Sequence, residues 1–325
     1  MGRYVIRRLL SILVVIAILT FLTFVIYFEL PPNNSIYEVF THGQRTARAS
    51  ALTRQYLGLN LPFPGRYLVY VRHLVLGDRY GWPGFWYSFQ TRSALKPIIA
   101  SRAVVTAQLA IGAAIIWLAV GLPLGIVSAL RPRTRADRIS MGFAVLGVST
   151  PVFFVGSMLL YVFWFKLGIA GSAGYVPIGQ GVDTWISHMI LPWITLAIPY
   201  AAFYSRMARG SLIESLGEDY IRTARAKGVA ESRIVARHAL RASLIPLLMM
   251  FGMDLGSLFG GAIIVETIFN LPGLGSLAVT SIQHDDLYAL ADITLVVCVA
   301  IAFMNLAVDL VHAAVDPRVR YARMG

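Results

Sequence analysis

The residues of this 325-residue chain that could perform chemistry are few, and the acidic ones stand out because they lie in apolar stretches. Asp254 stands near the middle of the stretch Leu244–Ile268, while Glu266, Asp292 and Asp309 lie toward the ends of such stretches. A carboxylate is costly in lipid, so Asp254 either lines a hydrated path for a solute or accepts a hydrogen bond from a neighbouring helix. Both alternatives stay open. The other three carboxylates can reach the membrane interface, which favours a structural role.

Patterns typical of catalysis, metal binding and nucleotide binding are missing from the sequence. His42 and His73 stand alone, and neither a convincing Ser/His pair nor a His/Glu metal motif occurs in the apolar stretches. The single cysteine, Cys298, rules out an intrachain disulfide and a cysteine-based metal cluster. Gly273 and Gly275 resemble turn glycines, since no Lys-Ser/Thr follows them, and no GxxxxGK[ST] motif occurs anywhere. We expect no catalytic residue, no metal site and no cofactor bound by this chain.

A long polar interval, Glu218–Pro246, interrupts the apolar second half of the chain. Apolar residues recur in it at helical spacing, which indicates two short amphipathic helices. Gly228 stands between them, where the end of a helix favours a residue that tolerates positive φ. Basic residues outnumber acidic ones in and just before the interval: Arg206, Arg209, Arg222, Arg225, Lys227, Arg233, Arg237 and Arg241. Such an elbow could dock on a partner protein or lie on anionic lipid headgroups.

Composition places the chain among multi-pass membrane proteins. Hydrophobic residues make up 57% and charged residues 14% of the sequence, and the mean hydropathy is +0.69, outside the range of ordinary soluble domains. A net charge of +12 would suggest nucleic acid as a partner of a soluble chain. In a membrane protein the position of the charges matters more than their sum, so no nucleic-acid partner is expected.

Six apolar segments are long enough to cross a bilayer core of about 30 Å as helices. The first is preceded by three arginines and followed by no small-residue cleavage site, so we interpret it as an uncleaved anchor. Small residues in Gly252–Ala262 would let helices approach closely, which favours a packed bundle. The predicted spans are Leu9–Phe28, Ala103–Leu130, Ile139–Phe165, Ile186–Tyr204, Leu244–Ile268 and Leu287–Val308.

Basic residues predict the orientation of these spans. They gather at the N-terminus, between the second and third spans, in the central loop and at the C-terminus, whereas the two short loops on the other side together hold only Lys166. Because short loops rich in Lys and Arg stay in the cytoplasm, both termini are predicted to be cytoplasmic. The predicted organisation is an anchor helix with an extracytoplasmic segment (1–98), a transmembrane domain (99–315) containing a loop at 206–243, and a cytoplasmic tail (316–325).

Segments along nearly the whole chain resemble one family, in family order. The segment YIRTARAKG, followed by RHALR and a later IP, is similar to the cytoplasmic loop of ABC importer permeases of the oligopeptide/dipeptide (OppB/DppB) type. The pattern in Leu57–Asp78 resembles the outer segment of that branch, although Arg79-Tyr80-Gly81-Trp82 departs from the usual Gly-Xaa-Ser. Further similar segments are GVSTPVFFVGSMLL (147–160), GGAIIVETIFNLPGLGSL (260–277), NLAVDL (305–310) and DPRVRY (316–321).

The resemblance implies an all-α polytopic membrane protein with six transmembrane helices in the type I ABC importer (MetI-like) permease fold, and a small extracytoplasmic segment after the first helix. It also implies that the loop carries coupling helices that dock on an ATPase. With Gly228 on the family's motif glycine, Ala224 falls on the last alanine of its Glu-Ala-Ala motif. Ala230 stands where the family commonly has a Ser N-cap, a loss that costs about 1 kcal/mol. The expected coupling residues are Arg222, Thr223, Ala224, Arg225, Ala226, Lys227 and Gly228, and Asp254 is the expected path residue.

The resemblance further implies a bacterial cytoplasmic (inner) membrane protein that is not an enzyme. Its expected partners are a second homologous permease subunit, two ABC ATPase subunits that use ATP, an extracytoplasmic peptide-binding protein and membrane lipid. The expected mechanism is alternating access driven by ATP. Alternatives that stay open are a permease for nickel chelates or glutathione, and a proton-coupled secondary transporter. The latter usually has internal repeats and several deeply placed ionisable residues, whereas only Asp254 clearly lies at depth.

Overall fold

The computed structural model describes residues 2–30, 60–77, 81–85, 87–88 and 93–315. Most of the predicted outer segment and all of the predicted tail 316–325 therefore lie outside the described residues. The chain divides into two compact units that do not follow chain order. Unit 1 consists of Met1–Val104 and Gly273–Phe303, and unit 2 consists of Val105–Pro272 and Met304–Gly325.

Unit 1 is built around aromatic side chains. Phe28 lies 5.2 Å from Tyr70 and 5.1 Å from Tyr288 between ring centroids, and all three rings are buried. Arg66 and Glu29 form an ion pair at 2.9 Å beside this cluster. The described elements of the unit are α1 (Gly2–Phe24), its π-helical end η1 (Val25–Glu29), α4 (Phe63–Leu76), the antiparallel pair β1 (Tyr87–Ser88) and β2 (Ser93–Ala94), α13 (Leu274–Gln283), and the first parts of α5 (Leu95–Leu130) and α14 (Leu287–Val315).

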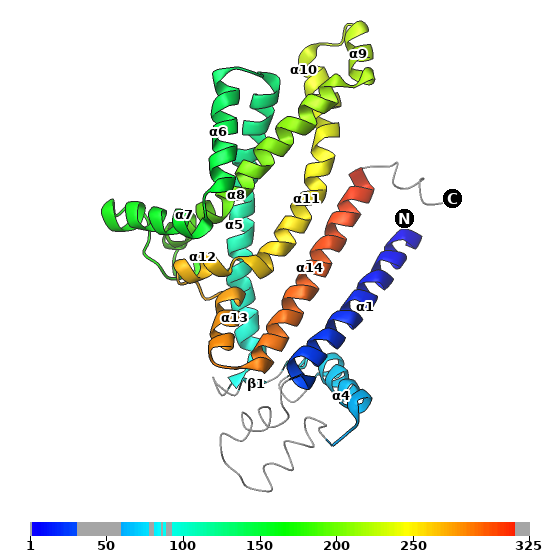
Figure 1. Ribbon diagram of the computed structural model, residues 1–325, viewed down its shortest axis with the longest axis vertical. Coiled ribbons are helices and arrows are strands. Elements are labelled where there is room, and N and C mark those ends of the chain that lie inside the picture. Colours follow the sequence, from blue (N-terminus) through cyan, green and yellow to red (C-terminus); the bar gives the residue numbers. More distant parts are fainter. Residues whose placement is uncertain (1, 31–59, 78–80, 86, 89–92, 316–325) are drawn as a thin grey trace. The chain divides into compact units, whose positions relative to one another are not determined.

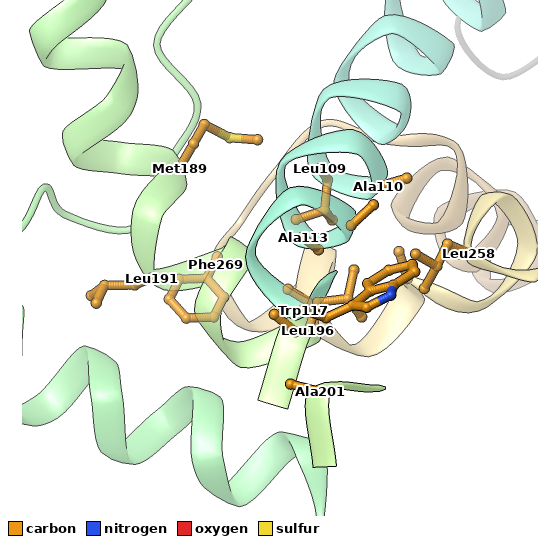
Figure 2. Packing of buried hydrophobic residues seen from close by; sticks show 14 of the residues in the cluster. Leu109, Ala110, Ala113, Trp117, Met189, Leu191, Leu196, Ala201, Leu258 and Phe269 are labelled. Atoms are coloured by element: carbon orange, nitrogen blue, oxygen red, sulfur yellow. The ribbon is translucent and has the colours of Figure 1, made fainter. Parts of the chain in front are cut away.

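Unit 2 is a helical bundle with a core around Trp117 of α5 (Figure 2). Trp117 is completely buried, and its ring stacks on Tyr200 of α8 at 4.8 Å. Besides α5, the unit's described elements are α6 (Arg135–Ser149), α7 (Val152–Leu159), η2 (Leu160–Lys166), η3 (Ile178–Gln180), α8 (Val182–Gly217), α9 (Asp219–Ala226), α10 (Glu231–Arg233), η4 (Ile234–Ala239), α11 (Leu240–Gly261), α12 (Ile263–Ile268) and the last part of α14.

Glycines allow the long helices of unit 2 to approach closely. A Cβ added at Gly125 of α5 would lie 2.4 Å from the backbone oxygen of Ser205 on α8. A Cβ at Gly252 of α11 would lie 1.5 Å from the side chain of Val308 on α14. Real Cβ atoms are not found at such distances, so neither position tolerates a side chain without movement of its neighbour. The close approach predicted for the small residues of Gly252–Ala262 is confirmed at Gly252.

Among the residues that the structure describes, five helices are long and apolar enough to cross a membrane, and a sixth span results if one bent pair of helices is counted as a span. The bent pair, Arg135–Ser149 with Val152–Lys166, replaces the predicted third span Ile139–Phe165 and turns by 103°. The cause is local: Pro151 fixes its own φ at −61°, and Thr150 before it is extended, as residues preceding proline usually are. The predicted third span therefore consists of two helices joined by a sharp bend.

The second, fourth and fifth predicted spans also differ from the structure, and the second begins earlier, at Leu95. The predicted fourth span ended at Tyr204, whereas α8 continues to Gly217 and carries its polar end beyond the apolar stretch. The predicted fifth span, Leu244–Ile268, is divided at Ala262 into α11 and α12. Figure 1 shows α7 and α12 lying across the direction of α6 and α11, and the two short helices pack against each other.

Candidate functional site

The polar interval forms an elbow between α8 and α11. Helix α8 ends at Gly217, α9 covers Asp219–Ala226, and the chain turns back into α10 after Gly228. Figure 1 shows α9 and α10 at the same end of α8 and α11. Gly228 has φ +74°, and a Cβ added there would meet no atom within 4 Å. The predicted positive φ at Gly228 is confirmed, and backbone conformation alone accounts for the need for glycine.

A Schellman arrangement terminates α9. The backbone N–H of Gly228 donates to the carbonyl of Arg225 at 3.0 Å, and the N–H of Val229 donates to the carbonyl of Ala224 at 3.2 Å. These two bonds satisfy carbonyls that the end of a helix leaves without partners. Val229 and Ala224 also pack against the same apolar cluster, the hydrophobic contact that commonly accompanies this motif. The turn is therefore a defined structure and not a loose connection.

The second predicted helix of the elbow is not a separate helix. Helix α10 passes directly through the π-helical turn η4 into α11, so the residues after the turn form one continuous helical segment with the following span. Ala230 occupies the N-cap position and makes no side-chain hydrogen bond there, as its side chain cannot. A movement of this segment would therefore move α11 with it, because no loop separates the two.

An ion pair closes the elbow across the turn. The Nη2 and Nε atoms of Arg225 lie 2.7 and 3.1 Å from the two carboxylate oxygens of Glu231. Hydrogen bonding to Glu231 raises the pKa of the Arg225 guanidinium, so the pair remains charged. Both side chains are exposed, at 43% and 59%, so solvent screens the pair and it orients the turn more than it stabilises the fold.

An apolar cluster beneath α9 fixes the helix on the bundle. Ile221 of α9 is completely buried, together with Leu212 of α8 and Ile234 of η4. Burial of one such side chain contributes roughly 1.5–3 kcal/mol. Ala129 of α5 and Ala239 of η4 complete the buried set. Through Ile221, α9 is tied to three other helical elements of unit 2.

The predicted coupling residues divide between the two faces of α9. Ala224 is half-buried and packs against the cluster around Ile221, so part of its surface is already covered by its own chain. Tyr220, which sequence analysis did not select, is a large side chain with 45% of its surface exposed. The remaining coupling residues on the exposed face of the elbow are Arg222, Thr223, Arg225, Ala226, Lys227 and Gly228.

Asp137 forms a buried charged group with Arg209 that was not predicted from the sequence. Asp137 of α6 accepts hydrogen bonds from Arg209 of α8, at 2.8 and 3.2 Å, and from the hydroxyl of Ser128 on α5. Asp137 also accepts from the backbone N–H of Arg133 at 2.8 Å, and its own N–H donates to the N-cap Thr134. Arg209 precedes Leu212 by one helical turn. Asp137, Arg209 and Ser128 therefore join α5, α6 and α8 close to Leu212, which packs beneath α9. In the sequence, only the Thr134-x-x-Asp137 spacing pointed to this arrangement.

The carboxylates of the apolar stretches have partners inside the protein. The hydroxyl of Tyr204 donates to Asp254 Oδ2 at 2.7 Å, and Asp254 remains half-buried. Thr106 donates to Glu266 at 2.7 Å. Glu266 and Asp292 are completely buried inside the protein, which fits the structural role expected for both. The side chain of Asp309 lies outside the described residues.

Known protein families and relatives match this chain over nearly its whole length. Residues 121–321 match the family described as binding-protein-dependent transport system inner membrane component, and residues 1–110 match the family of its N-terminal part. The chain is 34% identical to the probable peptide ABC transporter permease protein y4tP of Sinorhizobium fredii, over 99% of this chain and 100% of the relative. It is 37% identical to the glutathione transport system permease protein GsiC of Escherichia coli K12, with the same coverage.

Solved structures support the fold. The inward-facing MetNI methionine ABC transporter matches with a TM-score of 0.55 at 17% identity, covering 68% of this chain and 98% of the other. An amino acid ABC transporter solved with histidines matches with a TM-score of 0.53 at 15% identity, covering 67% and 94%. The predicted MetI-like type I permease fold is thereby confirmed.

Proposed function

Because the chain belongs to the binding-protein-dependent transport system inner membrane components and is a permease subunit of an ABC importer, we propose that it forms half of a translocation path for short peptides. The observation that carries the substrate class is the likeness, over 99% of the chain, to a probable peptide permease and a glutathione permease. The chain is a multi-pass protein of the bacterial inner membrane, and the distribution of basic residues supports cytoplasmic N- and C-termini.

The elbow is the proposed contact with the ATPase. Its exposed face includes Arg222, Thr223 and Ala226, and its turn is closed by the Schellman bonds at Gly228. ATP would close a pair of ATPase subunits and displace α9. Ile221 would pass this displacement to α8 and to the continuous α10–α11 segment, since it packs against both. Alternating access then follows from rigid movement of these helices.

The energy for transport is proposed to come from ATP bound by partner subunits. The sequence contains no GxxxxGK[ST] motif, so ATP is expected to be bound by partner subunits and no cofactor by this chain. The proposed complex contains two ABC ATPase subunits, a second homologous permease and an extracytoplasmic peptide-binding protein, all within or against membrane lipid. No nucleic-acid partner is proposed.

Glutathione is the second candidate substrate, favoured by the 37% identity to a glutathione permease. A nickel chelate remains a third candidate from the sequence resemblance alone. Membership of an ABC importer family argues against the proton-coupled transporter, which would need no ATPase.

Reconstitution tests the proposal. The two permeases, the ATPases and the loaded binding protein would be placed in liposomes, and uptake of labelled dipeptide, tripeptide, glutathione and nickel chelate compared with and without ATP. We expect ATP-dependent uptake of a peptide, and no saturable nucleotide binding by the purified chain alone. Uptake driven by a proton gradient without ATP, or tight nucleotide binding by this chain, would contradict the proposal.

A further inference from the structure

Asp254 carries a carboxylate in the middle of a long apolar helix without an ionic partner among the described residues. The ion pairs of the described part of the chain join other residues: Arg66 with Glu29, Arg209 with Asp137, Arg222 with Asp219, and Arg225 with Glu231. One oxygen of Asp254, Oδ2, accepts the hydroxyl of Tyr204, and the residue remains half-buried. A charge in this position is costly unless water or a counter-charge reaches it.

A group of aromatic rings lies next to this carboxylate through Tyr204. Tyr204 donates its hydroxyl to it, and Tyr200 lies one helical turn earlier on α8. Trp117 stacks on Tyr200 at 4.8 Å and lies 6.0 Å from Tyr204 (Figure 2 shows Trp117 within its packing). A carboxylate bonded to one member of an aromatic group combines a negative charge with the π-systems that attract organic ammonium groups.

The indole N–H of Trp117 provides a second observation at the same place. It is buried, and among the described residues it has no hydrogen-bond partner. A buried donor without a partner is uncommon and costs free energy in that state. Such a donor is expected where a ligand, or another conformation of the transport cycle, supplies an acceptor.

We propose that Asp254, together with Tyr200, Tyr204 and Trp117, forms a transient site for the positively charged amino group of the substrate as it crosses the membrane. The inference rests on the proposed peptide transport and makes it more specific, because the site would favour molecules that carry an ammonium group. A peptide with a free N-terminus has that group, whereas its N-acetylated form does not.

A structural hydrogen bond alone would not require the charge of Asp254. An asparagine oxygen accepts the Tyr204 hydroxyl equally well in geometry, so Asp254→Asn keeps the acceptor and removes only the negative charge. Asp254→Glu keeps the charge on a longer side chain. Tyr204→Phe removes the hydrogen bond and keeps the ring. These three variants separate the charge from the packing.

The test measures ATP-driven uptake of free trialanine and of N-acetyl-trialanine by the complete complex, each supplied on preloaded binding protein. Every variant rate is divided by the wild-type rate for the same peptide, which removes the selectivity of the binding protein. Asp254→Asn should slow free trialanine about tenfold, the usual effect of losing a hydrogen bond to a charged group, and leave N-acetyl-trialanine within about twofold. Asp254→Glu should recover most of the loss, and Tyr204→Phe should slow free trialanine less than Asp254→Asn.

Equal slowing of both peptides by Asp254→Asn, or no slowing of either, would overturn the inference while leaving peptide transport intact. Failure of Asp254→Asn to assemble, measured by size-exclusion recovery of the complex, would overturn it in favour of a packing role. Absence of peptide uptake by the wild-type complex would refute the proposed substrate itself, and this inference with it.

Discussion

The turn at Gly228 allows the coupling proposal to be tested with a single substitution whose structural effect is confined to the backbone. Gly228 has φ +74°, and an added Cβ would meet no atom within 4 Å, so Gly228→Val introduces no clash at Cβ. An L residue forced into the left-handed region costs about 1–2 kcal/mol. Since each 1.4 kcal/mol corresponds to tenfold in an equilibrium constant, the native elbow should lose roughly 5- to 30-fold in population relative to relaxed conformations.

If the ATPase binds only the native elbow, its affinity for the permease pair should fall with the fraction of chains in that elbow, by at most the same roughly 5- to 30-fold factor. The measurement is a titration of ATPase onto permease pairs in nanodiscs. Gly210→Val is the matched control, because Gly210 is exposed, helical and has open space around an added Cβ, without positive φ. Unchanged affinity in Gly228→Val, or equal loss in both variants, would refute the reasoning. A loop that only binds lipid should instead respond to removal of Arg222 and Lys227.

Two further predictions concern the architecture around the elbow. Asp137→Ala leaves Arg209 without its carboxylate partner, so this variant should aggregate in detergent at a lower temperature than the wild type. Glu214→Ala, which removes an exposed acidic residue of α8, is the control. Equal aggregation temperatures for the two variants would show that the Asp137–Arg209 pair does not stabilise the fold. In a Cys298→Ser background, Gly179→Cys should react with an impermeant thiol reagent added to intact cells and Ser232→Cys should not, because the two exposed positions lie on opposite sides of the predicted topology. Labelling at position 232 from outside would reverse the orientation.

The features that sequence analysis predicted correctly depend on local properties of the chain. Long apolar runs identify most spans because the bilayer imposes a minimum length on a helix. The glycine after α9 was recognisable because a left-handed residue at a helix end favours Gly over every other residue. The close approach at Gly252 followed from the small residues on either side of Asp254.

The features that were missed depend on where distant segments meet. Asp137 and Arg209 are 72 residues apart, so the sequence gives no sign that they pair. Arg209 was used only as one of the basic residues that predict the orientation of the spans. The contact of Ala224 with the cluster around Ile221 was not predicted either, because it depends on how α9 lies on α8 and η4. The bend before Pro151 did have a local signal, because the residue before a proline is usually extended. Hydropathy averaged over the whole segment does not show this signal.

The central claim is that α9 contacts a separate ATPase, and photo-crosslinking from its exposed face tests this most directly. Ala226→Cys in a Cys298→Ser background would carry a photoreactive maleimide, and Gly179→Cys, exposed in the loop before α8, would serve as control. In the intact complex we predict a crosslink from position 226 to the ATPase subunit whose yield changes on addition of ATP, and none from position 179. A complex that hydrolyses ATP and imports substrate, yet crosslinks position 226 only to lipid, would contradict the account.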